Sequence, residues 1–186
     1  MTDDIQSANP TRYSRGAIIL HWAIAALVLS TIPLGWYGAS AETASAQAAT
    51  NLHKTVGILI LALTLVRVGW RLTHKPPALP ASMKRSLRWI AKISHSLFYL
   101  LLVVMPLSGW WMSSAVPERH AFGFGIFDIP FLPVPRGWPS AGPAYFIHTT
   151  LAWLMIGLAV LHIIAALKHH FIDKDDILAR ILPRKS

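Results

Sequence analysis

Five histidines of this sequence fall inside long apolar stretches, where an ionisable side chain usually has a partner or a function. Histidine can bind a metal, transfer a proton or donate a hydrogen bond. A hydrogen bond to a neighbouring helix explains one such residue well. Five of them, with scarcely an acidic residue nearby to pair with, favour a shared role. They are His21, His53, His95, His148 and His162.

The spacing of these histidines indicates two stacked metal centres. His148 and His162 are 14 residues apart, which is close to four turns of an α-helix, so both face the same way about 21 Å apart. Each then needs an opposite ligand at its own depth. His21 and His162 lie near one end of their stretches, and His53 and His148 lie near the other end. We therefore predict the pairs His21–His162 and His53–His148.

Haem b fits two such pairs better than zinc does. A zinc site takes four tetrahedral ligands, whereas haem iron takes two axial imidazoles and the porphyrin fills the space between helices. The residue four positions after His95 is Tyr99, but the corresponding residue after each proposed ligand is small. These small residues are Ala25, Gly57, Ala152 and Ala166. The absence of cysteine excludes iron–sulfur clusters, thiolate zinc sites and covalently attached haem.

Four apolar stretches must position these residues, and each is long enough to cross a bilayer about 30 Å thick. They cover about residues 16–37, 52–70, 89–112 and 144–168. Hydrophobic residues make up 54% of the chain, and they come in long blocks rather than in short periodic runs. The predicted fold is all-α: an integral membrane four-helix bundle that forms a single domain over residues 1–186.

The connections between these stretches differ in charge, and this predicts the topology. Both termini and the connection 71–88 are basic, whereas the connections 38–51 and 113–143 carry few charges. The basic residues are Arg12 and Arg15, then Arg71, Lys75, Lys84, Arg85 and Arg88, then Lys174, Arg180, Arg184 and Lys185. By the positive-inside rule both termini are cytoplasmic. The net charge of +9 therefore indicates topology and not nucleic-acid binding.

The two poorly charged connections carry further predictions. Residues 38–51 are expected to form a small polar loop, and residues 113–143, rich in Pro, Gly and aromatic residues, a segment partly on the membrane surface. Ala39-Ser40-Ala41 and Ala44-Ser45-Ala46 look like signal-peptidase sites. The apolar stretch before them is longer than the apolar region of a signal peptide, about 7–15 residues. We therefore expect the first stretch to remain as a membrane span.

The remaining histidines suggest a quinone site. His95 lies in the cytoplasmic half of its stretch, and His169 follows His162 by seven residues on nearly the same face. Either side chain can donate to a quinone carbonyl or transfer protons. An interfacial contact with water or headgroups is an equal alternative for His169. Lys92, one turn before His95, could hold partial negative charge on the reduced ring.

Several motifs together resemble the bacterial cytochrome b561 family, the four-helix di-haem relatives of the b-type subunit of nickel–iron hydrogenase. The motifs are Leu20-His21-Trp22, Leu52-His53-Lys54-Thr55-Val56-Gly57, Ser94-His95-Ser96-Leu97-Phe98-Tyr99, the His148 and His162 pair, and the tail from Lys168. The resemblance covers about residues 12–185. It implies bis-histidine haem b on both sides of the bacterial inner membrane. It also implies a ubiquinone site near the cytoplasmic haem, where His95 and His169 match family positions.

The leading functional prediction is a di-haem b protein that passes electrons between a periplasmic donor and ubiquinone. The resemblance implies superoxide:ubiquinone oxidoreductase activity as one form of it. Lys54, Arg119, His120 and Arg136 could attract the superoxide anion, but Glu42 is the only charge in the first periplasmic loop, which leaves the donor open. One alternative is a haem-b membrane anchor of a dehydrogenase or hydrogenase complex. Another is a transporter that uses the histidines as a proton relay.

Overall fold

Four long helices account for most of the chain in the computed structural model, which describes residues 12–80 and 83–183. They are α1 (Arg15–Ser40), α2 (Ala44–Thr73), α3 (Arg85–Ala115) and α4 (Trp138–Phe171). Each is long and apolar enough to cross a membrane. Within these residues the only β-structure is an isolated bridge between Gly123 and Asp128. The predicted all-α membrane bundle is confirmed.

Every helix extends beyond the predicted span, and α2 differs most. It begins at Ala44 and not near residue 52, so that only residues 41–43 connect it to α1. The Thr43 hydroxyl accepts a hydrogen bond from the Ala46 N–H at 3.2 Å and caps the first turn. Alanine has the highest helix propensity, and the segment after the cap is rich in it. The predicted polar loop over residues 38–51 is therefore wrong. Most of these polar residues belong to the ends of α1 and α2, which extend beyond the apolar stretches.

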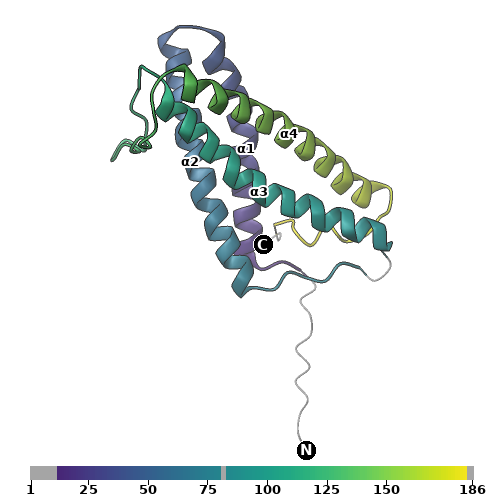
Figure 1. Ribbon diagram of the computed structural model, residues 1–186. Helices are drawn as coiled ribbons and strands as arrows, with labels where there is room; N and C mark the ends of the chain where they lie inside the picture. Colours follow the sequence, from purple (N-terminus) through teal and green to yellow (C-terminus); the bar gives the residue numbers. More distant parts are fainter. Residues whose placement is uncertain (1–11, 81–82, 184–186) are drawn as a thin grey trace, which may run out of the picture.

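The helices pack as two pairs that cross each other (Figure 1). The backbone of α1 packs along α2, that of α3 along α4, and α2 joins the two pairs through α3. Within the described ranges, the backbone of α4 packs closely on neither α1 nor α2. Aromatic rings bridge this separation, as between Trp36 and Trp153, whose ring centres lie 6.0 Å apart. Side chains, and not backbone contacts, therefore connect α4 with α1.

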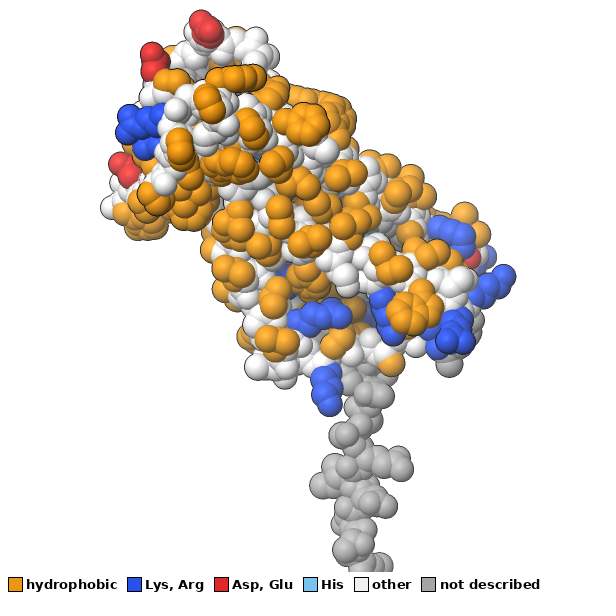
Figure 2. All heavy atoms as spheres, viewed as in Figure 1, with side chains coloured by type: hydrophobic (Ala, Val, Ile, Leu, Met, Phe, Trp, Pro, Cys, Tyr) orange, Lys and Arg blue, Asp and Glu red, His pale blue; other side chains and the backbone are white. Residues whose placement is uncertain are grey.

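A small apolar core fills the middle of the bundle. All four helices contribute to it, through Ile24, Ile60, Leu101, Leu102 and Met155. Met155 lies seven residues from both His148 and His162, so the core separates the two predicted metal centres. Hydrophobic side chains also cover much of the outer surface between the bundle ends (Figure 2). An outer apolar surface is the one expected of helices that contact lipid.

The two ends of the described chain meet at one end of the bundle. The indole N–H of Trp22 donates to the Ile181 carbonyl at 2.9 Å, and the Arg180 guanidinium donates to the Ala78 carbonyl at 2.7 Å. The tail therefore lies against both α1 and the α2–α3 connection. Lys and Arg side chains gather at this end (Figure 2), as the charge pattern predicts. Arg184 and Lys185 lie outside the described residues.

The connection between α3 and α4 covers the opposite end. Its residues Phe122 and Ile129 are buried. The Thr55 hydroxyl of α2 donates to the Gly123 carbonyl at 3.1 Å, and the Trp110 indole of α3 donates to the Pro130 carbonyl at 2.8 Å. This segment is shorter than predicted because α3 and α4 extend into it. It is packed on the helices close to His53.

Candidate functional site

Two histidines from different helices face each other near the covered end of the bundle. The ring centres of His53 in α2 and His148 in α4 are 6.1 Å apart, with the ring planes at 83°. Metal–nitrogen bonds of about 2 Å on opposite sides of one metal would place two imidazole centres about 6 Å apart. The separation of these two rings therefore fits two histidines that would hold a single iron. His53 and His148 are here called the outer pair.

Hydrogen bonds fix the orientation of both rings of the outer pair. His53 Nδ1 lies 2.9 Å from the Thr31 carbonyl of α1. His148 Nδ1 lies 3.2 Å from the Met105 carbonyl and 3.1 Å from the Ser108 hydroxyl, both of α3. A carbonyl only accepts, so each Nδ1 carries the proton and each Nε2 keeps its lone pair. Metal-binding histidines are typically held in this way.

A glycine makes room for each of these rings. A Cβ at Gly35 would lie 3.0 Å from Cε1 of His53, and one at Gly109 would lie 2.9 Å from Cε1 of His148. Each glycine stands four residues after the carbonyl that holds the ring, so one helical turn supplies both the acceptor and the space. The sequence analysis missed this role, because it depends on which helices become neighbours.

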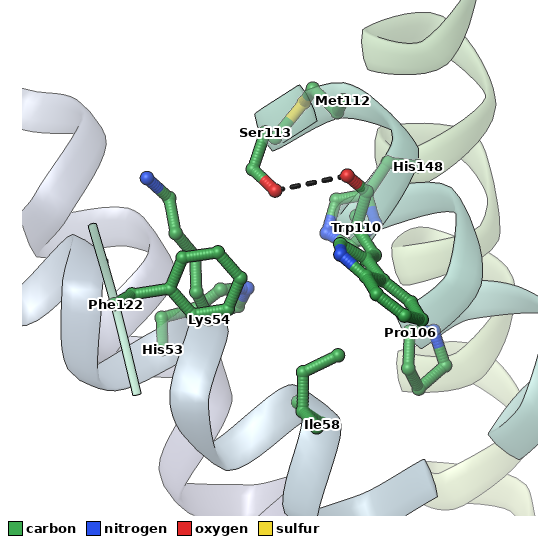
Figure 3. A pocket seen from close by; sticks show the side chains of 11 residues that line it. His53, Lys54, Ile58, Pro106, Trp110, Met112, Ser113, Phe122 and His148 are labelled. Atoms are coloured by element: carbon green, nitrogen blue, oxygen red, sulfur yellow. Dashed lines mark hydrogen bonds between the residues drawn. The ribbon is translucent and has the colours of Figure 1, made fainter. Parts of the chain in front are cut away.

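A mainly apolar pocket separates the two sides of the outer site (Figure 3). Lys54 and Phe122 lie on the side of His53, and Trp110 lies on the side of His148. A Cβ at Gly57, which also lines the pocket, would meet no atom within 4 Å. The Lys54 ammonium is 5.6 Å from the centre of the Phe122 ring. The apolar walls and the open space at Gly57 suit a porphyrin, and Lys54 adds one cation.

Three histidines converge near the other end of the bundle. The ring centres of His21 in α1 and His162 in α4 are 6.4 Å apart, at 66°; these two residues are here called the inner pair. His95 in α3 also approaches His162, with 5.8 Å between ring centres, and Phe98 lies 5.2 Å from it. The structure therefore brings the predicted pair together and places His95 beside it.

Arg67 of α2 is a charged residue at this site that the sequence analysis missed. Its Nε donates to the Tyr99 hydroxyl at 3.3 Å, and its Nη1 donates to the Ala17 carbonyl at 3.5 Å. The guanidinium is within electrostatic reach of His21 and His95. It forms no ion pair in the described part of the chain. A charge inside the apolar stretch 52–70 is the signal that could have revealed it.

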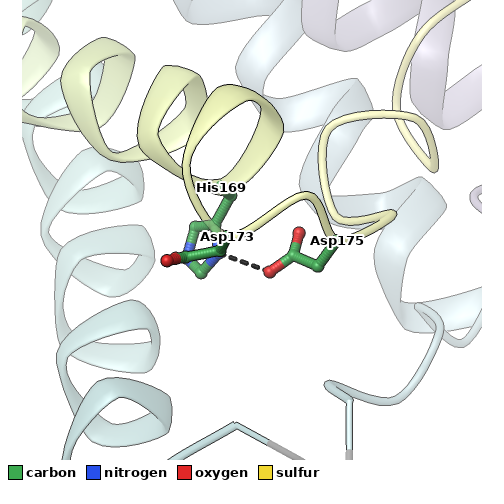
Figure 4. A group of neighbouring side chains, drawn as sticks. All are labelled: His169, Asp173 and Asp175. Atoms are coloured by element: carbon green, nitrogen blue, oxygen red, sulfur yellow. Dashed lines mark hydrogen bonds and ion pairs between the residues drawn. The ribbon is translucent and has the colours of Figure 1, made fainter.

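His169 lies at the end of α4 in a charged cluster (Figure 4). Its Nδ1 is 2.6 Å from an Asp175 carboxylate oxygen and 3.3 Å from Asp173. Lys168 donates to both Asp173 oxygens, at 2.7 and 2.6 Å, and these hydrogen bonds lower the pKa of Asp173. His169 and the two carboxylates could hold a cation. The Lys168 ammonium already occupies Asp173, so the cluster is an ion-pair network.

The structure does not bring all the predicted quinone residues together. Among the described residues, no ring contact joins His95 with His169; the ring of His95 faces His162. The Lys92 ammonium lies 5.2 Å from the ring centre of Trp89 in its own helix, on the exposed side of α3. His95 is thus placed to meet a ligand beside the inner pair, whereas Lys92 turns towards Trp89.

Comparison with known proteins agrees with this geometry. The chain is 36% identical over 179 residues to cytochrome b561 homolog 2 of Escherichia coli, covering 95% of this chain and 94% of that protein. It is 30% identical to cytochrome b562 of Cereibacter sphaeroides over 91% of this chain and 94% of that protein. A probable superoxide oxidase of Yersinia pestis is 26% identical over 94% of this chain and 97% of that protein.

The family model for prokaryotic cytochrome b561 matches residues 12–184, nearly the whole chain. This match includes all four helices and every histidine of the outer and inner pairs. Membership implies binding of haem b, for which the paired imidazoles, the glycines beside them and the apolar walls are suited. The chain therefore belongs to the prokaryotic cytochrome b561 family and is a bacterial multi-pass membrane protein of electron transfer.

Proposed function

We propose that this protein holds two haem b groups and passes electrons across the inner membrane between a periplasmic donor and ubiquinone. Bound haem b supplies a reversible one-electron carrier. The main support is the presence of two histidine pairs, with ring centres 6.1 and 6.4 Å apart, towards opposite ends of one apolar bundle. An apolar core lies between them, so each pair forms a separate site.

At the outer site the chain would bind and orient the cofactor. His53 and His148 would hold the haem iron through Nε2, because the carbonyls of Thr31 and Met105 occupy both Nδ1 atoms. A hydrogen bond to Nδ1 also makes the imidazole a stronger electron donor. The buried ring of Phe122 and the rest of the α3–α4 connection would exclude water from this end.

At the inner site we propose His21 and His162 as the ligands. His95 is closer to His162 than His21 is, with 5.8 Å against 6.4 Å between ring centres, so distance alone does not select His21. The residue one turn later favours His21. The residues one turn after His21 and His162 are Ala25 and Ala166, which leave space for a porphyrin, whereas His95 is followed by Tyr99.

His95 is then available for quinone. One of its ring nitrogens donates to the Ala91 carbonyl of its own helix, so neutral His95 keeps a lone pair on the other nitrogen. This nitrogen can accept a hydrogen bond from a quinol hydroxyl and, once protonated, can donate to a quinone carbonyl next to the inner pair. Reduction of a quinone to a quinol takes up protons as well as electrons, so the site needs a proton path. His169 with its partners Asp175 and Asp173 offers groups that exchange protons at the bundle end.

The periplasmic donor is proposed to be a small oxidisable species such as superoxide. The relative of Yersinia pestis is named a probable superoxide oxidase. Lys54 lies in the wall of the outer site. Arg119, which bonds the Ser114 carbonyl, and Arg136 lie within electrostatic reach of each other in the covering connection. Positive potential of this kind raises the local concentration of an anion.

Stoichiometry and single substitutions test this function. The purified protein should contain about two haem b per chain by the pyridine haemochrome assay. In redox titrations, His53→Ala and His148→Ala should remove one component, and His21→Ala and His162→Ala the other. His95→Ala should retain both. A ratio near one would contradict the two-haem proposal. Loss of a haem in His95→Ala would identify His95, and not His21, as the ligand opposite His162.

A further inference from the structure

Arg67 is a cation placed inside an apolar helix, and no acidic residue in the described part of the chain pairs with it. It lies six residues before the end of α2 at Thr73, and its guanidinium reaches the Ala17 carbonyl, one turn before His21 on α1. A charged side chain in a membrane span costs several kcal/mol of solvation unless it is compensated. Such residues usually mark a binding site or an ion path.

The contacts of Arg67 in the structure do not compensate this charge. Its two hydrogen bonds, of 3.3 and 3.5 Å, are longer than the usual 2.9–3.0 Å, and both acceptors are neutral. The four apolar stretches that form the membrane-crossing parts of the helices contain no Asp or Glu. The carboxylates of Asp173 and Asp175 are engaged by Lys168 and His169. Several guanidinium N–H groups therefore remain available to an anion.

The surroundings of Arg67 resemble an anion site more than a simple helix contact. A pocket beside it is lined by Tyr13, Trp70, Arg71 and Tyr99, among others. The Arg71 guanidinium lies 5.7 Å from the centre of the Tyr99 ring. Two guanidinium groups and a phenol hydroxyl thus meet between the inner pair and the end of the bundle. Guanidinium forms strong, often bidentate hydrogen bonds with carboxylate and phosphate.

We propose that Arg67 binds a carboxylate of the haem held by the inner pair, with the Tyr99 hydroxyl as a second donor. This inference rests on the proposed haem at His21 and His162. A lipid phosphate would offer similar chemistry. The haem carboxylate is favoured because the guanidinium is half-buried and within electrostatic reach of both His21 and His95. Its charge would also favour the reduced state of the inner iron.

Substitution of Arg67 tests the proposal through haem affinity and potential. In Arg67→Met, the inner component should titrate at a lower potential, and its haem should transfer to apomyoglobin about tenfold faster. The outer component should keep its potential and transfer rate, which shows that the variant is folded. Arg67→Lys should restore part of both properties, because it keeps the charge but not the fork of donors. Arg85→Met, on the exposed start of α3, is the matched control.

Each contrary result has a distinct meaning. If the unsubstituted protein holds two haems, and Arg67→Met leaves both potentials and both transfer rates unchanged, the inference is wrong. Loss of tightly bound phospholipid phosphorus from Arg67→Met in that case would assign the guanidinium to a lipid phosphate. If the unsubstituted protein holds no haem at the inner pair, the proposed function itself fails.

Discussion

A histidine that binds iron through Nε2 must be held by its other nitrogen, and the outer pair achieves this without a carboxylate. Carbonyls of α1 and α3 accept from His53 and His148, and a glycine one turn later leaves space for each ring. Neighbouring helices thus position the proposed ligands at the cost of no buried charge. A carboxylate in the same place would have to be desolvated in the membrane.

Gly109→Ala should disturb the outer site selectively. The added Cβ would lie 2.9 Å from Cε1 and 3.2 Å from Nδ1 of His148, so the ring has to move away from the Met105 carbonyl. We expect lower occupancy of the outer haem, by about tenfold in affinity or ~1.4 kcal/mol, with the inner haem retained. Haem content and redox titration measure this. Gly157→Ala on α4, where a Cβ meets no atom within 4 Å, is the control, and equal losses in both variants would contradict the steric explanation.

Quinone reduction should depend on His95 and His169 without either being a haem ligand. His95→Ala removes the imidazole beside His162, and His169→Ala removes the partner of Asp175. Each should retain both haems and slow reoxidation of the reduced protein by a ubiquinone analogue at least about tenfold, or ~1.4 kcal/mol of barrier. Stopped-flow absorbance after removal of excess reductant measures the rate.

Lys92 provides a contrast for this prediction. Its ammonium packs over Trp89 on the exposed side of α3, so Lys92→Met should leave the rate nearly unchanged if the histidines alone form the site. Slow reoxidation of the Lys92→Met variant would place the ring of the quinone nearer to Lys92, towards the start of α3. Normal rates in both histidine variants would move the site elsewhere, most plausibly towards the outer pair.

At the level of helices, the sequence predicted the parts that follow from the length of the apolar stretches and from helical spacing. The apolar stretches lie inside the observed helices, and helical geometry alone paired His21 with His162 and His53 with His148 by depth; both pairs lie together in the structure. The positions of the caps were missed, since the segment after Thr43 is polar yet helical. An apolar pattern reports the lipid-facing part of a helix and not its full length.

Contacts between helices were the part that the sequence could not provide. Gly35 makes room for His53, and Arg67 reaches the Ala17 carbonyl, because α1 packs on α2. The sequence alone does not show which helices are neighbours. Asp175 was missed for a related reason, since the tail has to turn back before its carboxylate meets His169. Residue type and spacing therefore identified the histidines, and only the packing identified what holds them.

Removal of haem should loosen α4 more than α1 or α2. In the described residues the backbone of α4 packs on α3 alone, and histidine rings face each other across the remaining separation. A ligand that bridges helices stabilises only the folded state. Protein made under haem depletion should therefore unfold at a lower temperature and show faster hydrogen exchange in α4. Comparable increases in the α1–α2 hairpin would argue against haem as the bridge.

On the scale of the whole molecule, charge and chain geometry lead to the same topology. Four spans return the chain to its starting side, and Arg12 donates to the Leu182 carbonyl at 3.0 Å, so both described ends share one end of the bundle. The basic α2–α3 connection lies there too, held by Arg180. Positively charged segments are retained in the cytoplasm. The outer pair would then face the periplasm, which is where a soluble donor would have to act.

The absence of cysteine allows a direct test of this orientation. Glu42→Cys places a single thiol on the exposed turn between α1 and α2, and Lys75→Cys places one on the exposed connection after α2. A membrane-impermeant maleimide added to spheroplasts should label Glu42→Cys at once and Lys75→Cys only after permeabilisation, because the positive-inside rule places the basic connection in the cytoplasm. The unsubstituted chain, having no thiol, is the blank. The reverse pattern would place the inner pair, Arg67 and the quinone site on the periplasmic side, and a periplasmic donor would then meet His21 and His162 first.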